Sequence, residues 1–218
     1  MVDLSWLYQT LRKNMGPSGW WPADSKQEII LGAILVQNTN WQNAAVSLKA
    51  LKKATNYDAK QILALSNDQL IDLIRPSGFY KNKSKAIQSV YGWFEKQGWN
   101  YHQVRNKIGK DLRKELLDLH GVGQETADVF LVYVFDLPEF IADSYTRRLF
   151  KQLGYKKTKT YRDLKFQVSL PDSFDYKDAQ DFHGLIDNFG KVYLRDPAKF
   201  AGSFLGREIA LRNGRKRL

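Results

Sequence analysis

Apolar residues follow helical spacing along most of the chain. Between residues 41 and 51 they recur at i, i+3, i+4 and i+7, which predicts a helix with one buried face. The same spacing, or capping signals beside it, predicts further helices over 66–74, 86–94, 112–119, 125–136, 144–153, 178–194 and 203–212. We find no alternating strand pair and no Asn-Gly or Asp-Gly turn between apolar runs, so we expect an all-α protein.

The composition narrows the class of protein. The chain has 218 residues, 43% of them hydrophobic, with 12 Phe, 11 Tyr and 6 Trp, which is ample for a core and argues against disorder. It has no cysteine, which excludes disulfides, zinc ribbons, thiolate catalysis and cysteine-ligated iron–sulfur clusters. No apolar run approaches a membrane span, and residues 1–6 do not resemble a signal peptide. We expect a cytoplasmic protein without a membrane partner, nucleoid-associated if bacterial.

The charge points to a polyanionic partner. Lysine and arginine number 34 against 23 acidic residues, giving a formal net charge of +11. Basic side chains that face phosphates gain affinity by releasing counterions, so nucleic acid is favoured over a membrane surface. The alternative is a basic surface that serves solubility alone. The basic segment 212–218 is either a solvated end or an accessory phosphate contact.

The segment Leu117–Asp128 is the most informative part of the sequence. A leucine-rich helix runs into Gly121-Val122-Gly123, and a second apolar helix follows at once. Glycines allow positive φ and leave no side chain before the backbone amides, while Val122 can turn inward between the two helices. Amides at the positive end of a helix dipole bind anions such as DNA phosphate. The alternative is a hairpin whose glycines serve packing only.

Asp143 follows Gly121 by 22 residues, at the start of a predicted helix. The apolar pair Ile141-Ala142 leads into it, and Ser144 comes next. A carboxylate in this position can be a catalytic group. It can also be a simple helix N-cap.

These motifs together resemble the helix–hairpin–helix/Gly-Pro-Asp signature of the endonuclease III superfamily of DNA glycosylases. The resemblance covers roughly residues 20–200 and is closest to the iron–sulfur-free 3-methyladenine DNA glycosylase III branch. Its further motifs are Trp20-Trp21-Pro22, Leu31–Thr39, Arg75–Ala86 and Phe182–Lys191.

The resemblance implies two helical lobes with DNA in a cleft between them. One lobe would be a six-helix barrel of residues 26–137, and the other would combine 1–25 with 138–218. Gln37 would fill the gap left by a flipped base, and Lys83 would contact DNA. Without the resemblance, Gln37 could cap a helix and Lys83 could be solvated. The hairpin residues expected to grip phosphate are Gly121, Val122, Gly123, Gln124 and Thr126.

The resemblance also implies the chemistry. Asp143 would stabilise the oxocarbenium character of the sugar and help to orient water. Bifunctional members carry a lysine where this chain has Glu125, and a carboxylate cannot form a Schiff base. We therefore expect no lyase activity. We expect no iron–sulfur cluster or other cofactor, apart from K⁺ or Na⁺ on the hairpin carbonyls as in the family.

Aromatic residues supply a candidate base pocket. Trp20, Trp21 and Trp41 flank the family motifs, and Lys191 matches a family lysine near the site. Indole faces favour a cationic alkylpurine through cation–π attraction, about 1–2 kcal/mol when desolvated. The alternative is that these tryptophans anchor the core.

The resemblance therefore implies a monomeric, monofunctional DNA glycosylase that flips a damaged base out of double-stranded DNA and removes it. An alkylated purine such as 3-methyladenine is the favoured substrate. Two alternatives stay open: a mismatch- or oxidised-base-directed glycosylase of the same superfamily, and a non-catalytic damaged-DNA-binding protein.

Overall fold

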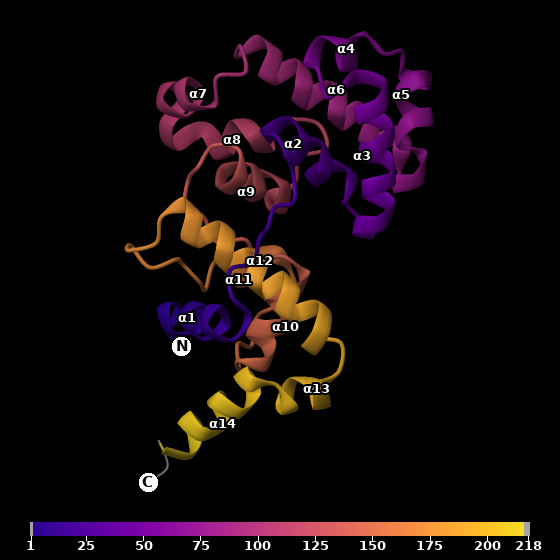
Figure 1. Cartoon of the computed structure of the whole chain (residues 1–218). Coiled ribbons are helices and arrows are strands. Elements are labelled where there is room, and N and C mark those ends of the chain that lie inside the picture. Colours follow the sequence, from indigo (N-terminus) through magenta and orange to yellow (C-terminus); the bar gives the residue numbers. More distant parts are fainter. Residues whose placement is uncertain (1, 216–218) are drawn as a thin grey trace. The chain divides into compact units, whose positions relative to one another are not determined.

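The computed structural model describes residues 2–215, and of residues 213–215 it describes the backbone alone. Over this range all regular structure is helical, which confirms the all-α prediction (Figure 1). None of the helices in the described range is long and apolar enough to span a membrane. The predicted basic end lies partly outside the described residues.

The chain divides into two units, one continuous and one assembled from both ends of the sequence. The continuous unit is Ala23–Asp136, and the second unit joins the residues up to Pro22 to those from Leu137 onward. The sequence placed the first boundary at residue 26, which is the first residue of a helix rather than of the unit.

The continuous unit contains eight α-helices, two of which are only six residues long. Those two are α4 (Ala59–Ala64) and α8 (Leu112–Leu117). The other helices are α2 (Lys26–Leu35), α3 (Trp41–Thr55), α5 (Asn67–Ile74), α6 (Tyr80–Lys96), α7 (Tyr101–Ile108) and α9 (Gln124–Tyr133). Short 3-10 turns cover 75–77 and 109–111.

Helices α2 and α9 form the centre of this unit. Residues 30–35 of α2 and 126–133 of α9 are all buried. A helix that is apolar on every side is stable only when other helices surround it. Helix α2 accordingly packs against α3, α6 and α9, so the residues that follow α2 are held next to the hairpin that precedes α9.

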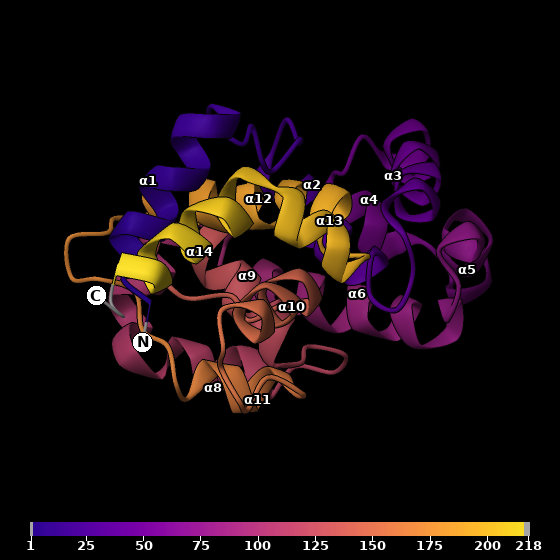
Figure 2. The same ribbon diagram turned by 90° about the horizontal axis from the view of Figure 1, so that it is seen from below.

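The discontinuous unit is built around α12. Its helices are α1 (Leu4–Met15), α10 (Ser144–Gln152), α11 (Tyr161–Lys165), α12 (Tyr176–Tyr193), α13 (Pro197–Gly202) and α14 (Phe204–Arg215). Helix α12 packs against α1, α10 and α13, and Figure 2 shows α14 leading from α13 toward α1, which it contacts.

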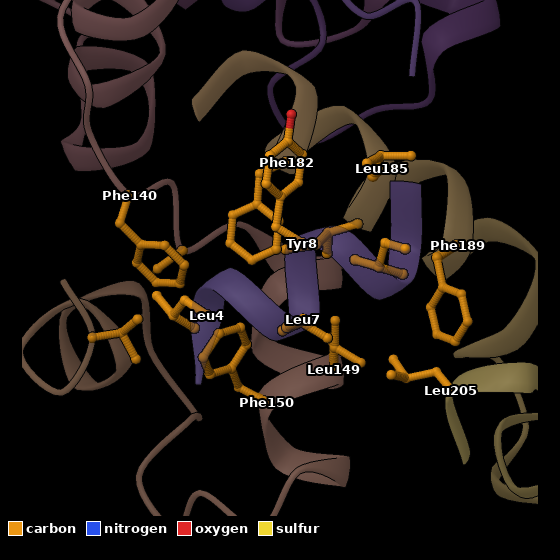
Figure 3. Close-up of a cluster of buried hydrophobic side chains, with 14 of the residues drawn as sticks. Leu4, Leu7, Tyr8, Phe140, Leu149, Phe150, Phe182, Leu185, Phe189 and Leu205 are labelled. Carbon is orange, nitrogen blue, oxygen red and sulfur yellow. The ribbon is translucent and has the colours of Figure 1, made fainter. Parts of the chain in front are cut away.

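A single apolar cluster joins the two ends of the chain in this unit. Figure 3 shows Leu4, Leu7 and Tyr8 of α1 among side chains from α10 and α12. Each fully buried Leu or Phe of such a cluster contributes about 1.5–3 kcal/mol. This cluster fixes α10 against α12, and both helices carry candidate site residues.

Candidate active site and nucleic-acid interface

The hairpin between α8 and α9 is held tightly by its glycine and its valine. Gly121 has φ +80°, and a Cβ at this position would lie 2.4 Å from Cβ of Ala86 in α6. Val122 is buried, as the sequence predicts. Behind the turn, the guanidinium of Arg113 donates two hydrogen bonds, of 2.7 and 3.2 Å, to the buried carboxylate of Asp128. The turn is therefore fixed to α6 on one side and its two helices are tied together.

The amides that open α9 are accessible. Gly123 is the N-cap residue, provides no side-chain cap, has φ −90°, and has open space where a Cβ would stand. Gly123, Gln124 and Glu125 are exposed. The geometry needed for phosphate binding is thus present at a ten-residue helix, although the positive φ belongs to Gly121 alone.

Gln37 is attached to this hairpin. Its Nε2 donates hydrogen bonds of 3.0 Å each to the carbonyl of Gly121 and to Oγ1 of Thr126. Thr126 is buried, so its hydroxyl holds Gln37 rather than facing solvent, and any phosphate contact from Thr126 comes from its backbone N–H. The structure therefore brings together two motifs that lie 84 residues apart in the sequence.

Lys83 differs from the expectation of a DNA-contacting side chain. It is only 2% exposed, and its ammonium donates hydrogen bonds to the carbonyls of Leu35 (2.8 Å) and Ser77 (2.6 Å). Burial lowers the pKa of Lys83 to about 8. Lys83 stabilises the turns that follow α2 and precede α6, and its charge does not reach a surface. We correct its role to a structural one.

Phe79 is a surface aromatic that the sequence analysis did not single out. It lies immediately before α6 with φ +47°, follows Gly78 with φ +67°, and is 64% exposed. Non-glycine residues rarely adopt this backbone conformation, and such strain concentrates at functional sites. The carbonyl of Ser77 that accepts from Lys83 fixes the same turn. Phe79 is a candidate contact residue because of its exposure and its backbone conformation, and neither can be read from the sequence.

Asp143 lies in the discontinuous unit and is the N-cap of α10. Its Oδ1 accepts a 2.7 Å hydrogen bond from the N–H of Thr146, so the alternative role as a helix cap is real. Its Oδ2 is not used by the cap and lies 3.9 Å from Nε2 of His183 in α12. The preceding loop is fixed by Arg147, which donates to the carbonyl of Ala142 at 2.8 Å. One carboxylate oxygen is therefore structural, and the other is available for chemistry.

A row of ionisable residues continues along α12 from this point. His183 is almost fully buried, and Asp187 and Lys191 follow at four-residue steps and form an ion pair. Burial lowers the pKa of His183, while the carboxylates of Asp143 and Asp187 oppose that shift and Lys191 adds to it. The imidazole is consequently neutral at neutral pH.

Trp20 and Trp21 lie beside Lys191. Their ring centroids are 5.3 Å apart, and Nζ of Lys191 is 4.7 Å from the centroid of Trp20. The Trp20 backbone packs against α12 at Gly184, where a Cβ would lie 2.4 Å from Cβ of Trp20. One face of Trp20 thus already holds a cation. Trp41 belongs to the continuous unit, as the first residue of α3, and is half-buried.

A separate pocket of about 390 Å³ lies in the continuous unit and contains none of the predicted site residues. Within the described range, no group of three or more His, Asp or Glu side chains could hold a metal ion. The carbonyls of Leu119 and Gly121 accept hydrogen bonds from Val122 and Gln37, and a carbonyl oxygen has two lone pairs.

These features define a helix–hairpin–helix protein with exposed amides at the hairpin turn of one unit and, in the other, a partly buried carboxylate that caps a helix with one oxygen. Residues 31–170 match the family described as HhH-GPD superfamily base excision DNA repair protein. A Methanocaldococcus jannaschii protein, MJ1434, whose name assigns it to the DNA repair glycosylases, is 37% identical over 198 residues, covering 88% of this chain and 89% of its own length. The chain belongs to the HhH-GPD superfamily of base excision repair DNA glycosylases.

Solved structures agree with this fold. The chain is similar to the H. pylori 3-methyladenine DNA glycosylase MagIII bound to 1,N6-ethenoadenine, with a TM-score of 0.70, 27% identity, and coverage of 87% of this chain and 98% of that one. It is also similar to a trapped endonuclease III–DNA covalent intermediate, with a TM-score of 0.72, 19% identity and 90% coverage of each chain.

Proposed function

We propose that this protein is a monofunctional DNA glycosylase that removes alkylated purines from double-stranded DNA. The observation that carries the proposal is the carboxylate of Asp143, which caps α10 with Oδ1 alone and leaves Oδ2 outside the cap. The likeness to a 3-methyladenine glycosylase, which spans 98% of that protein, supports the substrate class. The tryptophan pair beside Lys191 supports a flat, cation-accepting pocket.

The chemistry needs one carboxylate. An alkylated purine carries a positive charge and becomes neutral as the bond from C1′ to its nitrogen breaks, so it leaves without strong acid assistance. The sugar then gains oxocarbenium character, which the negative charge at Oδ2 of Asp143 stabilises. Water adds to C1′, and its proton passes to the carboxylate or to solvent. Because Lys191 already occupies one face of Trp20, we assign stacking of the base to Trp21 of the same unit.

Glu125 supports the absence of lyase activity. It is exposed in the first turn of α9, at the position where lyase members of the family carry a lysine. A carboxylate cannot attack C1′ to form an imine, so the strand is left intact after base removal.

DNA would be gripped by the accessible amides of Gly123, Gln124 and Glu125. Gln37, anchored to the hairpin, would fill the gap left by the flipped base, and Phe79 is a candidate apolar contact for an unstacked base. K⁺ or Na⁺ would sit on the carbonyls of Leu119 and Gly121, where it would add positive charge for the phosphate. The protein acts as a monomer on its DNA.

The test is base release from a panel of duplexes carrying methylated, deaminated, oxidised and mismatched bases. We expect release of 3-methyladenine by the wild type and almost none by Asp143→Asn. Asparagine caps a helix as well as aspartate does, so this variant should keep its stability and DNA affinity. Asp143→Ala should in addition lose about 1 kcal/mol of stability, measured by urea unfolding.

Three outcomes would contradict the proposal. Full activity of Asp143→Asn would remove the catalytic role. Release of thymine, uracil or oxidised purines in preference to alkylated ones would overturn the substrate class. Trapping of a covalent protein–DNA adduct by borohydride would show a Schiff base and end the monofunctional assignment.

A further inference from the structure

The environment of Asp143 contains one group that the proposed chemistry does not use. His183 lies on α12 with a side chain only 10% exposed, and its Nε2 faces Oδ2, the carboxylate oxygen that the helix cap leaves over. We propose that His183 is a positioning residue that holds Oδ2 of Asp143 toward the sugar and keeps its negative charge uncompensated at neutral pH. This inference rests on the proposed function, since it concerns the same reaction.

The geometry gives His183 control over one oxygen only. Oδ1 accepts a 2.7 Å hydrogen bond from the N–H of Thr146 and is fixed by it. The carboxylate can therefore still rotate only in a way that keeps Oδ1 in place and moves Oδ2. At 3.9 Å the Nε2 to Oδ2 separation is about 1 Å longer than a hydrogen bond, and a small rotation closes it. Catalytic hydrogen bonds often tighten when substrate binds.

The backbone around His183 leaves this helix little freedom to move. A Cβ on Gly184 would lie 2.4 Å from Cβ of Trp20, and a Cβ on Gly190 would lie 2.5 Å from the ring of Tyr145 in α10. Close contacts on two sides of α12 therefore hold His183 in register with the N-terminus of α10. Tyr145, the second residue of α10, makes the second of these contacts.

The protonation state of His183 decides its effect on Asp143. The charged groups that face it are Asp143 from the start of α10 and Asp187 and Lys191 from α12, and burial outweighs the two carboxylates, so its pKa lies below the usual 6.5. A neutral imidazole can donate an N–H to Oδ2 without neutralising it. Once protonated in acid, the imidazolium forms an ion pair with Asp143, and the carboxylate loses most of its capacity to stabilise the sugar cation.

Three substitutions separate these contributions. His183→Gln keeps an N–H donor at nearly the same distance from the backbone as Nε2, but the glutamine side chain does not titrate between pH 5 and 8.5. His183→Leu keeps apolar bulk and removes the donor. His102→Gln is the matched control, because His102 is exposed and belongs to the other unit.

The assay uses duplex DNA methylated with dimethyl sulfate and measures release of 3-methyladenine under single-turnover conditions from pH 5 to 8.5, with an enzyme-free blank at each pH. At pH 7.5 we expect His183→Gln to stay within about threefold of wild type and His183→Leu to lose about tenfold to a hundredfold, the worth of one hydrogen bond to a charged group. Wild type and His102→Gln should lose activity below pH 6.5. In His183→Gln that decline should shift to lower pH.

Four outcomes are decisive. The inference is wrong if the loss of activity in acid is the same in His183→Gln as in wild type, or if His183→Leu reacts at the wild-type rate. In either case the proposed function still stands, provided that Asp143→Asn is inactive. A slow His183→Gln together with a slow His183→Leu would assign His183 to packing and also overturn the inference. No release by the wild type would end the proposed substrate and this inference with it. Melting temperatures and duplex affinities of each variant distinguish misfolding from lost chemistry.

Discussion

Replacing Gly121 by alanine tests the geometry of the hairpin most directly. The residue has φ +80°, and a Cβ there would lie 2.4 Å from Cβ of Ala86 and 3.3 Å from its Cα. Gly123, two residues later, has φ −90° and open space at the same position, so Gly123→Ala is a matched control within one turn. The two substitutions add the same methyl group to the same loop.

The expected loss for Gly121→Ala has two parts. A left-handed conformation costs an L-residue about 1–2 kcal/mol. The overlap with α6 cannot be avoided by turning a side chain, because the opposing atom is a Cβ on helical backbone, and such overpacking costs about 1–3 kcal/mol. Together they reach about 3 kcal/mol, a fall in melting temperature of about 6–12 °C for a chain of this size. Gly123→Ala has neither term.

Urea and thermal unfolding of four proteins provide the assay: wild type, Gly121→Ala, Gly123→Ala, and Gly121→Ala combined with Ala86→Gly. The double substitution opens space for the new methyl group but retains the unfavourable φ, so it should recover only the part of the lost stability that comes from the overlap. Glycine within helix α6 reduces this gain by about 1 kcal/mol. The reasoning fails if Gly121→Ala is as stable as Gly123→Ala. It also fails if the second substitution recovers nothing.

Two further predictions concern DNA contact and pH. Phe79→Ala should weaken binding to duplex containing an abasic site by about fivefold to a hundredfold, since stacking on one base is worth about 1–3 kcal/mol. Phe166→Ala is the control, because Phe166 is also a highly exposed phenylalanine, and equal losses in the two variants would remove the role of Phe79. Lys83 has a pKa of about 8 when folded against about 10.4 unfolded, so the unfolded chain binds more protons between these values and stability should rise with pH across that window. Urea unfolding at pH 7.5, 8.5 and 9.5 measures this rise, and the free energy of unfolding of Lys83→Met should not show it. The same change of unfolding free energy with pH in wild type and Lys83→Met would contradict the prediction.

Local patterns in the sequence predict the helices well because each depends on neighbours a few residues away. The capping box at Ser66 and Gln69 forms as expected, and the turn at Gly121 and Val122 has the packing that its residue types require. Short helices such as α4 and α11 escape the pattern, because five or six residues are too few to show a period.

The errors concern side chains whose partners lie far away in sequence. The family resemblance predicts a DNA contact for Lys83, yet Lys83 falls at i, i+3, i+4 and i+7 with Ala86, Ile87 and Val90, so the helical period places it on the buried face. What the period cannot show is the pair of carbonyls, from Leu35 and Ser77, that makes burial of its ammonium tolerable.

The relation of Asp143 to His183 was hidden for the same reason. Forty residues separate them, and only the packing of α10 against α12 brings the imidazole to the carboxylate. The sequence does place both in family motifs. It does not show that one oxygen of Asp143 is committed to the helix cap, because that depends on the rotamer and not on the residue type.

The discontinuous unit has a consequence for how the chain folds as it is made. The apolar face of α1, with Leu4, Leu7 and Leu11, packs on α12, which begins at Tyr176. At about 5–20 residues per second of synthesis, roughly 10–30 s pass between the synthesis of α1 and that of α12. The residues of the continuous unit are synthesised in this interval and can fold during it. The unit that carries Asp143 is therefore the last to be completed, after the continuous unit that carries the Gly121–Gly123 hairpin.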